Sequence, residues 1–141
     1  MKDYYEQKNF KKSSYSKSLE KELKLLKALP CFEFSVELSK CAKNHAIEMG
    51  KTGKIGHDSS NGKSFSKRIK DCWSSNAVGE NCDYGNESGI DIFMSLLIDD
   101  GVPSLGHRKN ILSNLFTHLG LSVQPHKVYG TNCVMDFGAK K

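Results

Sequence analysis

Gly106-His107-Arg108-Lys109-Asn110-Ile111-Leu112, residues 106–112, is the stretch from which the rest of this chain can be interpreted. Two shorter motifs precede it, Gly56-His57 and Gly79-Glu80-Asn81. All three lie in turn-rich sequence beside glycine, outside the runs of periodic apolar residues. Histidine and carboxylate are the usual groups for metal binding and for proton transfer. We therefore expect the three motifs to converge on one site.

A metal site would have to be assembled from these separate segments. His57, His107 and Glu80 would supply three donors to a zinc ion, which usually takes four. The best candidates for the fourth donor are Asp99 and Asp100, at the end of a predicted helix just before His107. None of these residues has the i, i+4 spacing of a helical zinc motif.

A catalytic nucleophile has less support in the sequence. No serine stands in the Gly-x-Ser-x-Gly elbow of serine hydrolases. Cys72 or Cys82 could pair with His107 in a thiol enzyme, but no local signature accompanies either cysteine. A hydrolase built on this chain would therefore depend on water activated by a metal.

The order of secondary structure predicts an α+β fold. Helices are expected over residues 17–29, 35–50, 64–71 and 88–100, and strand-like alternation covers 119–123 and 128–137, with Pro125-His126 in the hairpin connection. Residues 72–86 are predicted to be a loop with short extended pieces. Because the helices come first and the strands last, alternating βαβ units are excluded.

Four polar residues have interpretations that need no ligand. His45 lies on the apolar face of helix 35–50, which favours a hydrogen-bonded core histidine over a metal ligand. His118 is expected to pack beside the sheet, and Cys133 to be a buried thiol. Arg108 is expected to anchor loops by donating hydrogen bonds to backbone carbonyls.

Charge is concentrated at the front of the chain. The net charge is +5, and residues 1–30 hold eight lysines and four acids, which leaves the remainder close to neutral. We predict a flexible basic tail at residues 1–16 and a single domain at 17–141. A nucleic-acid-binding domain should carry its basic charge on the folded face, so nucleic acid is not an expected partner. No apolar run is long enough to span a membrane.

Five cysteines are present, and no Cys-x-x-Cys motif occurs among them. This argues against a zinc site built from cysteines and against a redox pair. The number is moderate for a secreted protein and high for a cytosolic one, so it favours secretion and disulfide formation. An odd count leaves at least one thiol unpaired within the chain, and the sequence does not fix the pairing.

Residues 56–137 resemble the superfamily of cysteine-rich secretory proteins, antigen 5 and pathogenesis-related 1 proteins, the CAP superfamily with its SCP-like domain. The matching motifs are Ala42-x-x-His45-Ala46-x-x-Met49, Gly56-His57-Asp58-Ser59, residues 79–85, residues 106–112, residues 116–121 and the terminal strand. The short form of the motif at 106–112 is similar to the bacterial and protist branch. The resemblance implies a three-layer α-β-α sandwich with a central antiparallel sheet.

The resemblance also implies a cleft lined by two histidines and two acids. His57, Glu80 and His107 match three of these positions directly, and Asp99 matches the second acid by its place before the His107 motif. Such clefts bind a divalent metal, often zinc, in several members, and binding of lipid or sterol and extracellular location are common. We therefore expect a secreted binding protein, its leader absent from this sequence, with a lipid, a sterol or an extracellular protein as partner.

Two other interpretations of the same four groups remain open. A metal-dependent peptidase or esterase would use Glu80 as a general base beside the metal. A structural or interaction module would keep the cleft only as a polar network. Enzymatic activity is the less expected outcome, because convincing activity is not general to the family.

Overall fold

The computed structural model describes residues 12–75 and 77–140. Five helices and four strands are the elements used below: α2 (Ser14–Leu25), β1 (Glu33–Phe34), α3 (Val36–Thr52), α4 (Phe65–Ile69), β2 (Val78–Tyr84), α5 (Gly89–Ile98), α6 (Gly106–Ile111), β3 (His118–His126) and β4 (Gly130–Gly138). No helix within these described ranges is long and apolar enough to cross a membrane.

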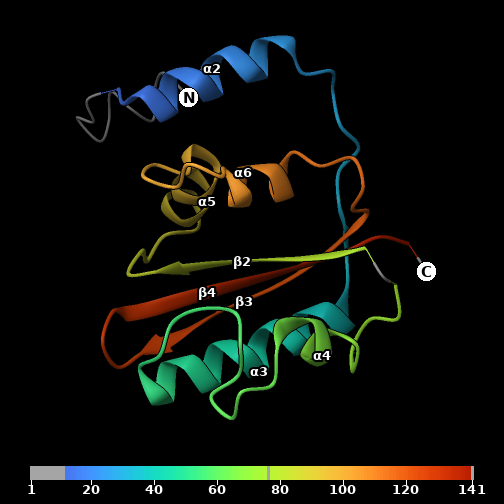
Figure 1. Ribbon diagram of the computed structural model, residues 1–141, viewed down its shortest axis with the longest axis vertical. Helices are drawn as coiled ribbons and strands as arrows, with labels where there is room; N and C mark the ends of the chain where they lie inside the picture. The colour runs from blue at the N-terminus through green and yellow to red at the C-terminus, as the bar shows by residue number, and fades with distance from the viewer. Residues whose placement is uncertain (1–11, 76, 141) are drawn as a thin grey trace.

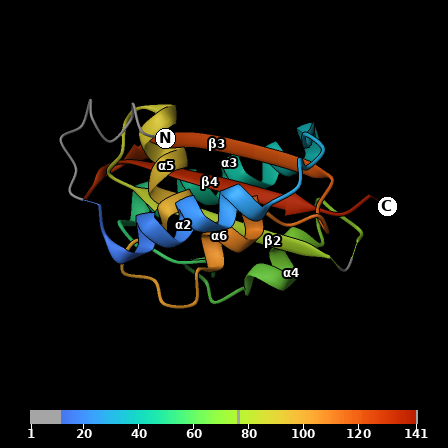
Figure 2. The same cartoon turned by 90° about the horizontal axis from the view of Figure 1, so that it is seen from above.

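The strands form one sheet in the order β1-β3-β4-β2, with helices on both faces. Helices α3 and α4 cover one face, and α5 and α6 cover the other (Figure 1). Seen from above, α2 lies across the layer formed by α5 and α6 (Figure 2). The predicted α+β sandwich is confirmed. The sheet is mixed, however, because β1 pairs with β3 in parallel, while β3 with β4 and β2 with β4 are antiparallel.

Helix α3 forms where the apolar periodicity predicts it. The Ser35 hydroxyl accepts a hydrogen bond from the backbone of Leu38, which caps the first turn. Gly53 ends the helix in the left-handed conformation at φ 72°. The buried stripe of this helix then packs on the sheet, where Gly120 of β3 allows the close approach. A β-carbon at Gly120 would lie 2.1 Å from the backbone nitrogen of Ser39.

Several element boundaries differ from the sequence prediction. Helix α2 begins at Ser14, so the last residues assigned to the tail are helical, and it ends at Leu25 rather than residue 29. Residues 1–11 of the predicted tail lie outside the described residues. The His107 motif is the short helix α6 rather than a turn, and Pro125-His126 ends strand β3 instead of joining two strands.

The prediction of a loop over residues 72–86 is wrong for Val78–Tyr84, which is strand β2. Five central residues of this strand are buried, and they include Glu80, Asn81 and Asp83. Polar side chains of this strand point to both faces of the sheet. Its sequence therefore does not alternate between apolar and polar residues, as that of a half-exposed strand does. The structure stabilises them with hydrogen bonds and ion pairs, which the sequence pattern does not reveal.

A disulfide joins Cys41 of α3 to Cys72, just after α4. Both flank a small apolar cluster around Leu38, Ile69 and Trp73. Among the remaining cysteines Cys31 is exposed, whereas Cys82 and Cys133 are buried. The expectation of a buried Cys133 thiol is confirmed, and burial raises its pKa to about 12.

Arg108 fixes α2 to the rest of the domain. Its guanidinium is buried and donates hydrogen bonds to the carbonyls of Leu97 and Ile98 at 3.0 and 2.7 Å. It also donates to the carbonyl of Tyr15 at 2.9 Å and to the Ser18 hydroxyl at 2.9 Å. The predicted anchoring role is confirmed, and it extends to a helix that lies about ninety residues away in the sequence.

We predict that Gly120→Ala lowers the free energy of unfolding by about 3 kcal/mol, because the new methyl group overlaps backbone atoms of α3. Gly89→Ala is the matched control, since no atom lies within 4 Å of its β-carbon position. That variant should change stability by no more than about 1 kcal/mol. Urea unfolding of both variants tests this, and equal effects would show that the contact between α3 and β3 is not tight.

We predict that Arg108→Ala destabilises the domain by about 3–5 kcal/mol, since it leaves several buried carbonyl groups without a donor. The neighbouring Lys109→Ala, at an exposed position, should stay within about 0.5 kcal/mol of the wild type. Thermal unfolding compares the two. A small loss for Arg108→Ala would mean that α2 is not held by this residue.

Candidate metal-binding cleft

Strand β2 is an edge strand of the sheet, and the candidate site is built along it. Glu80 lies in the middle of this strand, buried, and opposite Asp136 of β4. The loop after α3 brings His57 to this strand, and α6 brings His107. Segments that are 23 and 27 positions apart in the sequence thus meet at one edge.

His57 and Glu80 form the first histidine–carboxylate pair. The His57 Nδ1 atom lies 2.8 Å from Glu80 Oε1, and the ring is half-exposed. Arg68 of α4 donates to the other carboxylate oxygen and also to the carbonyl of His57 at 3.3 Å. The glutamate therefore contacts a guanidinium and an imidazole from two different segments.

These contacts raise the pKa of His57 and lower the pKa of Glu80. The hydrogen bond with Glu80 raises the pKa of His57, although burial acts against it. Burial of Glu80 opposes its ionisation, but the hydrogen bond with His57 and the charge of Arg68 outweigh that effect and lower its pKa. The pair is thus stabilised with a charged carboxylate.

His107 and Asp99 form the second pair. The Asp99 Oδ1 atom lies 2.7 Å from His107 Nδ1, and Oδ2 accepts from the backbone nitrogens of His107 and Arg108 at 2.9 and 3.2 Å. Asp99 ends α5 in the left-handed conformation, at φ 58°, which turns its carboxylate toward the start of α6. Asp100 is exposed, so Asp99 is the acid that contacts His107.

Two asparagines connect the pairs. Asn81 donates from its amide to the carbonyl of His107 at 3.0 Å. Asn110 donates to the side-chain oxygen of Asn81 at 2.8 Å and to the carbonyl of Glu80 at 3.3 Å. The asparagines of the two motifs therefore position α6 against β2 and do not act as ligands.

A cavity of about 390 Å³ lies beside this edge. Cys82 and His107 both line it, and the Cys82 sulfur is 3.8 Å from Nδ1 of His57. Its other walls include Asp83, Asp99 and Ser16. The His107–Asp99 pair therefore lines the cavity, Cys82 connects its wall to His57, and helix α2 supplies another part of the wall.

The motifs, the sandwich and the paired histidines can be compared with known proteins. The sequence model of the cysteine-rich secretory protein family, CAP, matches residues 7–137. The chain belongs to the CAP family. No curated protein sequence shows a significant match to it.

Three solved structures resemble this CAP domain. An outer surface protein from Borrelia burgdorferi is 26% identical, with a TM-score of 0.68 and 90% of each chain covered. An extracellular protein containing an SCP domain from Bacillus anthracis is 25% identical, with a TM-score of 0.66 over 79% of this chain. A cysteine-rich secretory protein from Staphylococcus aureus is 15% identical, with a TM-score of 0.54 over 87% of this chain, and shows the fold alone. This chain spans about a third of the length of the Bacillus and Staphylococcus proteins, at 35% and 36%.

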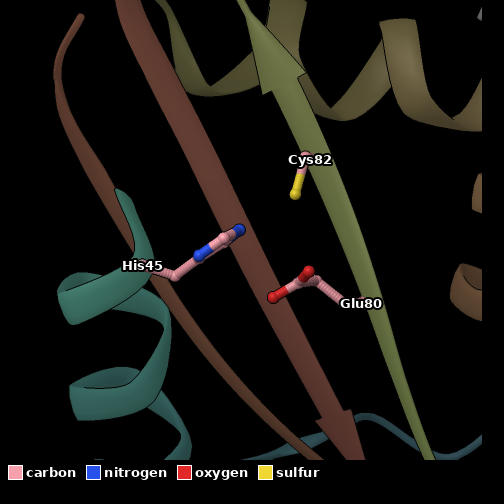
Figure 3. A group of neighbouring side chains, drawn as sticks. All are labelled: His45, Glu80 and Cys82. Carbon is pink, nitrogen blue, oxygen red and sulfur yellow. The ribbon is translucent and has the colours of Figure 1, made fainter. Parts of the chain in front are cut away.

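A second group of metal-type ligands lies on the inner side of β2 in this CAP domain. His45 of α3, Glu80 and Cys82 have ligand atoms that all lie within 4.8 Å of one another, and all three residues are buried (Figure 3). The prediction that His45 is a hydrogen-bonded core histidine is confirmed, since its Nε2 lies 2.9 Å from the carbonyl oxygen of Gly56. No spacing in the sequence indicates that Cys82 and Glu80 face it.

Arg68 and Asp136 are the other members of the site that the sequence analysis missed. Arg68 follows an exposed, polar stretch and carries no motif that would mark it as buried. Asp136 could have been noticed, because it is an acid between the apolar residues Met135 and Phe137 of the terminal strand. Burial and the neighbouring charge of Glu80 raise the pKa of Asp136 to about 9.

We predict that the pKa of His57 lies above the free value of about 6.5 and falls in Glu80→Gln, which removes the carboxylate that stabilises the imidazolium. Because the folded pKa is raised, this stabilisation is complete below about pH 6.5 and is lost as pH rises through the folded pKa. NMR titration of the histidine ring protons measures both values, with His118 as the internal control. An unchanged His57 titration in Glu80→Gln would contradict the pairing.

Proposed function

We propose that this CAP domain binds a divalent cation, with zinc as the best candidate, between His57 and His107. The observation that carries the proposal is that each imidazole offers its Nδ1 atom to a buried carboxylate. No hydrogen bond within the described ranges reaches Nε2 of either ring, so both Nε2 atoms remain as metal donors. A carboxylate behind a histidine is the usual support of a zinc ligand, since it fixes the tautomer and increases the basicity of the ring.

The residues present fit such a cation chemically. Two imidazole nitrogens with carboxylates behind them match the borderline preference of zinc. Glu80 and Asp99 act as positioning groups, each holding one ring in a fixed orientation. When bound, the metal would supply a positive charge that attracts an anionic or carbonyl oxygen of a ligand.

Binding is a better proposal than metal-dependent hydrolysis. A hydrolase would need Glu80 free to accept a proton from a metal-bound water. The Glu80 side chain is only 1% exposed and already interacts with Arg68 and His57. It is therefore poorly placed to act as a general base, which supports a domain that recognises a ligand without transforming it.

The lining of the cavity narrows the class of ligand. Four aspartates face it, among them Asp83, Asp91 and Asp100. The carboxylates suit a hydrated cation or a small polar ligand, whereas Leu96, Ile98 and Val102 give the same cavity an apolar part. A lipid or a sterol, expected from the family resemblance, could contact that apolar part.

We propose that the domain acts outside the cytoplasm. Its disulfide suits an oxidising compartment. The similar structures from Bacillus and Borrelia are described as an extracellular protein and an outer surface protein. Both observations support the location expected from the cysteine content.

We predict that zinc shifts the ring resonances of His57 and His107 at the same metal ratio and leaves His118 unchanged. His57→Ala should abolish the shift at His107, because one imidazole alone is a weak site. The effect should weaken as pH falls through the raised pKa of His57, since protons compete with the metal. Histidine-selective NMR measures each ring separately, with His118→Ala as the control variant. Independent responses of the two histidines, or equal binding at pH 5 and pH 7.5, would refute the shared site.

A further inference from the structure

The space between α3, α4 and the sheet holds an unusual number of buried polar atoms. His45 Nδ1, Arg68 Nε and Nη1, and both carboxylate oxygens of Asp136 have no hydrogen-bond partner. His45 and Asp136 are completely buried. An unpaired buried polar atom costs about 1–3 kcal/mol, and contacts of 3.8 Å from Arg68 to Asp136 and from His45 to Glu48 offset part of this cost. These groups make the space polar, and the metal-type ligand atoms beside it are those of His45, Glu80 and Cys82.

His45, Glu80 and Cys82 surround this space with three kinds of ligand atom. Their donor atoms lie within 4.8 Å of one another, and Figure 3 shows the ring of His45 pointing between the other two side chains. Donors around a tetrahedral zinc ion lie about 3.3–3.8 Å apart, given bonds of about 2.0–2.3 Å. Rotamer adjustments of about 1 Å would therefore close the three donors around one ion.

We propose that His45, Glu80 and Cys82 form a buried site for a thiophilic divalent cation such as zinc, separate from the pair of rings at His57 and His107. The site lies on the α3 side of β2 and uses a thiolate, which the outer pair does not. It uses different ligand atoms from the outer site, although Glu80 and Cys82 both contact His57. A carboxylate oxygen has two lone pairs, so Glu80 can accept from His57 and bind an ion.

The surroundings of His45 suit a change of tautomer on metal binding. Without an ion, Nε2–H donates to the carbonyl of Gly56, and Nδ1 is the unpaired buried atom. With an ion on Nε2, the proton moves to Nδ1, where Glu48 Oε2 lies 3.8 Å away. The ring then has a carboxylate behind it, as metal-bound histidines usually do.

The ligand atoms set the kind of ion that this site accepts. The sulfur of Cys82 favours soft and borderline ions, and the imidazole of His45 is compatible with them. Arg68 also faces the space and disfavours a cation, while the carboxylate of Glu80 opposes its charge. The site therefore selects zinc, cobalt or cadmium over magnesium and calcium.

Cobalt(II) titration of the metal-free protein tests the proposal, because a cobalt–thiolate bond gives a charge-transfer absorption in the near ultraviolet. The titration uses the Cys31→Ser background, which removes the exposed thiol. We expect the band to saturate at one equivalent of cobalt. Cys82→Ser should abolish it, and Cys133→Ser, at the other buried thiol, should retain it.

Two histidine variants separate this site from the outer one. His45→Ala should weaken cobalt binding, measured by this band, at least tenfold, whereas His107→Ala should leave the band unchanged. A band lost in His107→Ala would assign Cys82 to the outer site and overturn the proposal, as would the absence of any band. The zinc response of the His57 and His107 ring resonances is a separate readout, so either site can fail alone.

X-ray absorption of the zinc-loaded wild type covers the case in which Cys82→Ser does not fold. One sulfur at about 2.3 Å, with nitrogen and oxygen ligands at about 2.0–2.2 Å, is the expected first shell of the inner ion. A spectrum fitted without sulfur would refute the site. Thermal unfolding of each variant confirms that its fold is intact before its spectrum is compared.

Discussion

The ion pair of Arg68 and Glu80 is the interaction on which this edge of the molecule depends. It joins α4 to β2 and, through the second carboxylate oxygen, fixes the loop that carries His57. A buried charge without a partner would be strongly destabilising, so each of these groups requires the others. Because β2 is an edge strand, no other strand among the described residues lies on its outer side. Polar contacts hold the His57 loop and α6 against this outer edge of β2.

The two histidine–carboxylate pairs reach a similar arrangement by different means. Glu80 is held from the side by a guanidinium, within a strand. Asp99 is held by the first backbone nitrogens of α6, at the end of a helix, where a negative charge is favoured. The His57 side chain is 50% exposed and that of His107 is 27% exposed. We therefore expect ligand exchange to be easier on the side of His57.

The helices were the part of this fold that the sequence predicted best. Ser35, Gly53 and Ser88 cap these helices by rules that depend only on neighbouring residues. Strand β2 could not be recognised in the same way, because its stability comes from partners that are distant in the sequence. The short motifs identified the residues of the candidate site. The pairing of Asp99 with His107 depends on the left-handed backbone conformation of Asp99, which residue spacing does not predict.

Helix α2 packs on the apolar core and also forms part of the cavity wall. Ser13 and Ser16 line the same cavity as His107, and the helix is held there by Arg108, the residue after that histidine. One wall of the cavity is therefore formed by a helix whose hydrogen bonds to the rest of the domain converge on a single guanidinium. A substitution or a bound partner that loosened this contact would widen the cavity while leaving both histidines in place. The capacity of the cleft is in this way set by a helix that contributes no imidazole or carboxylate to it.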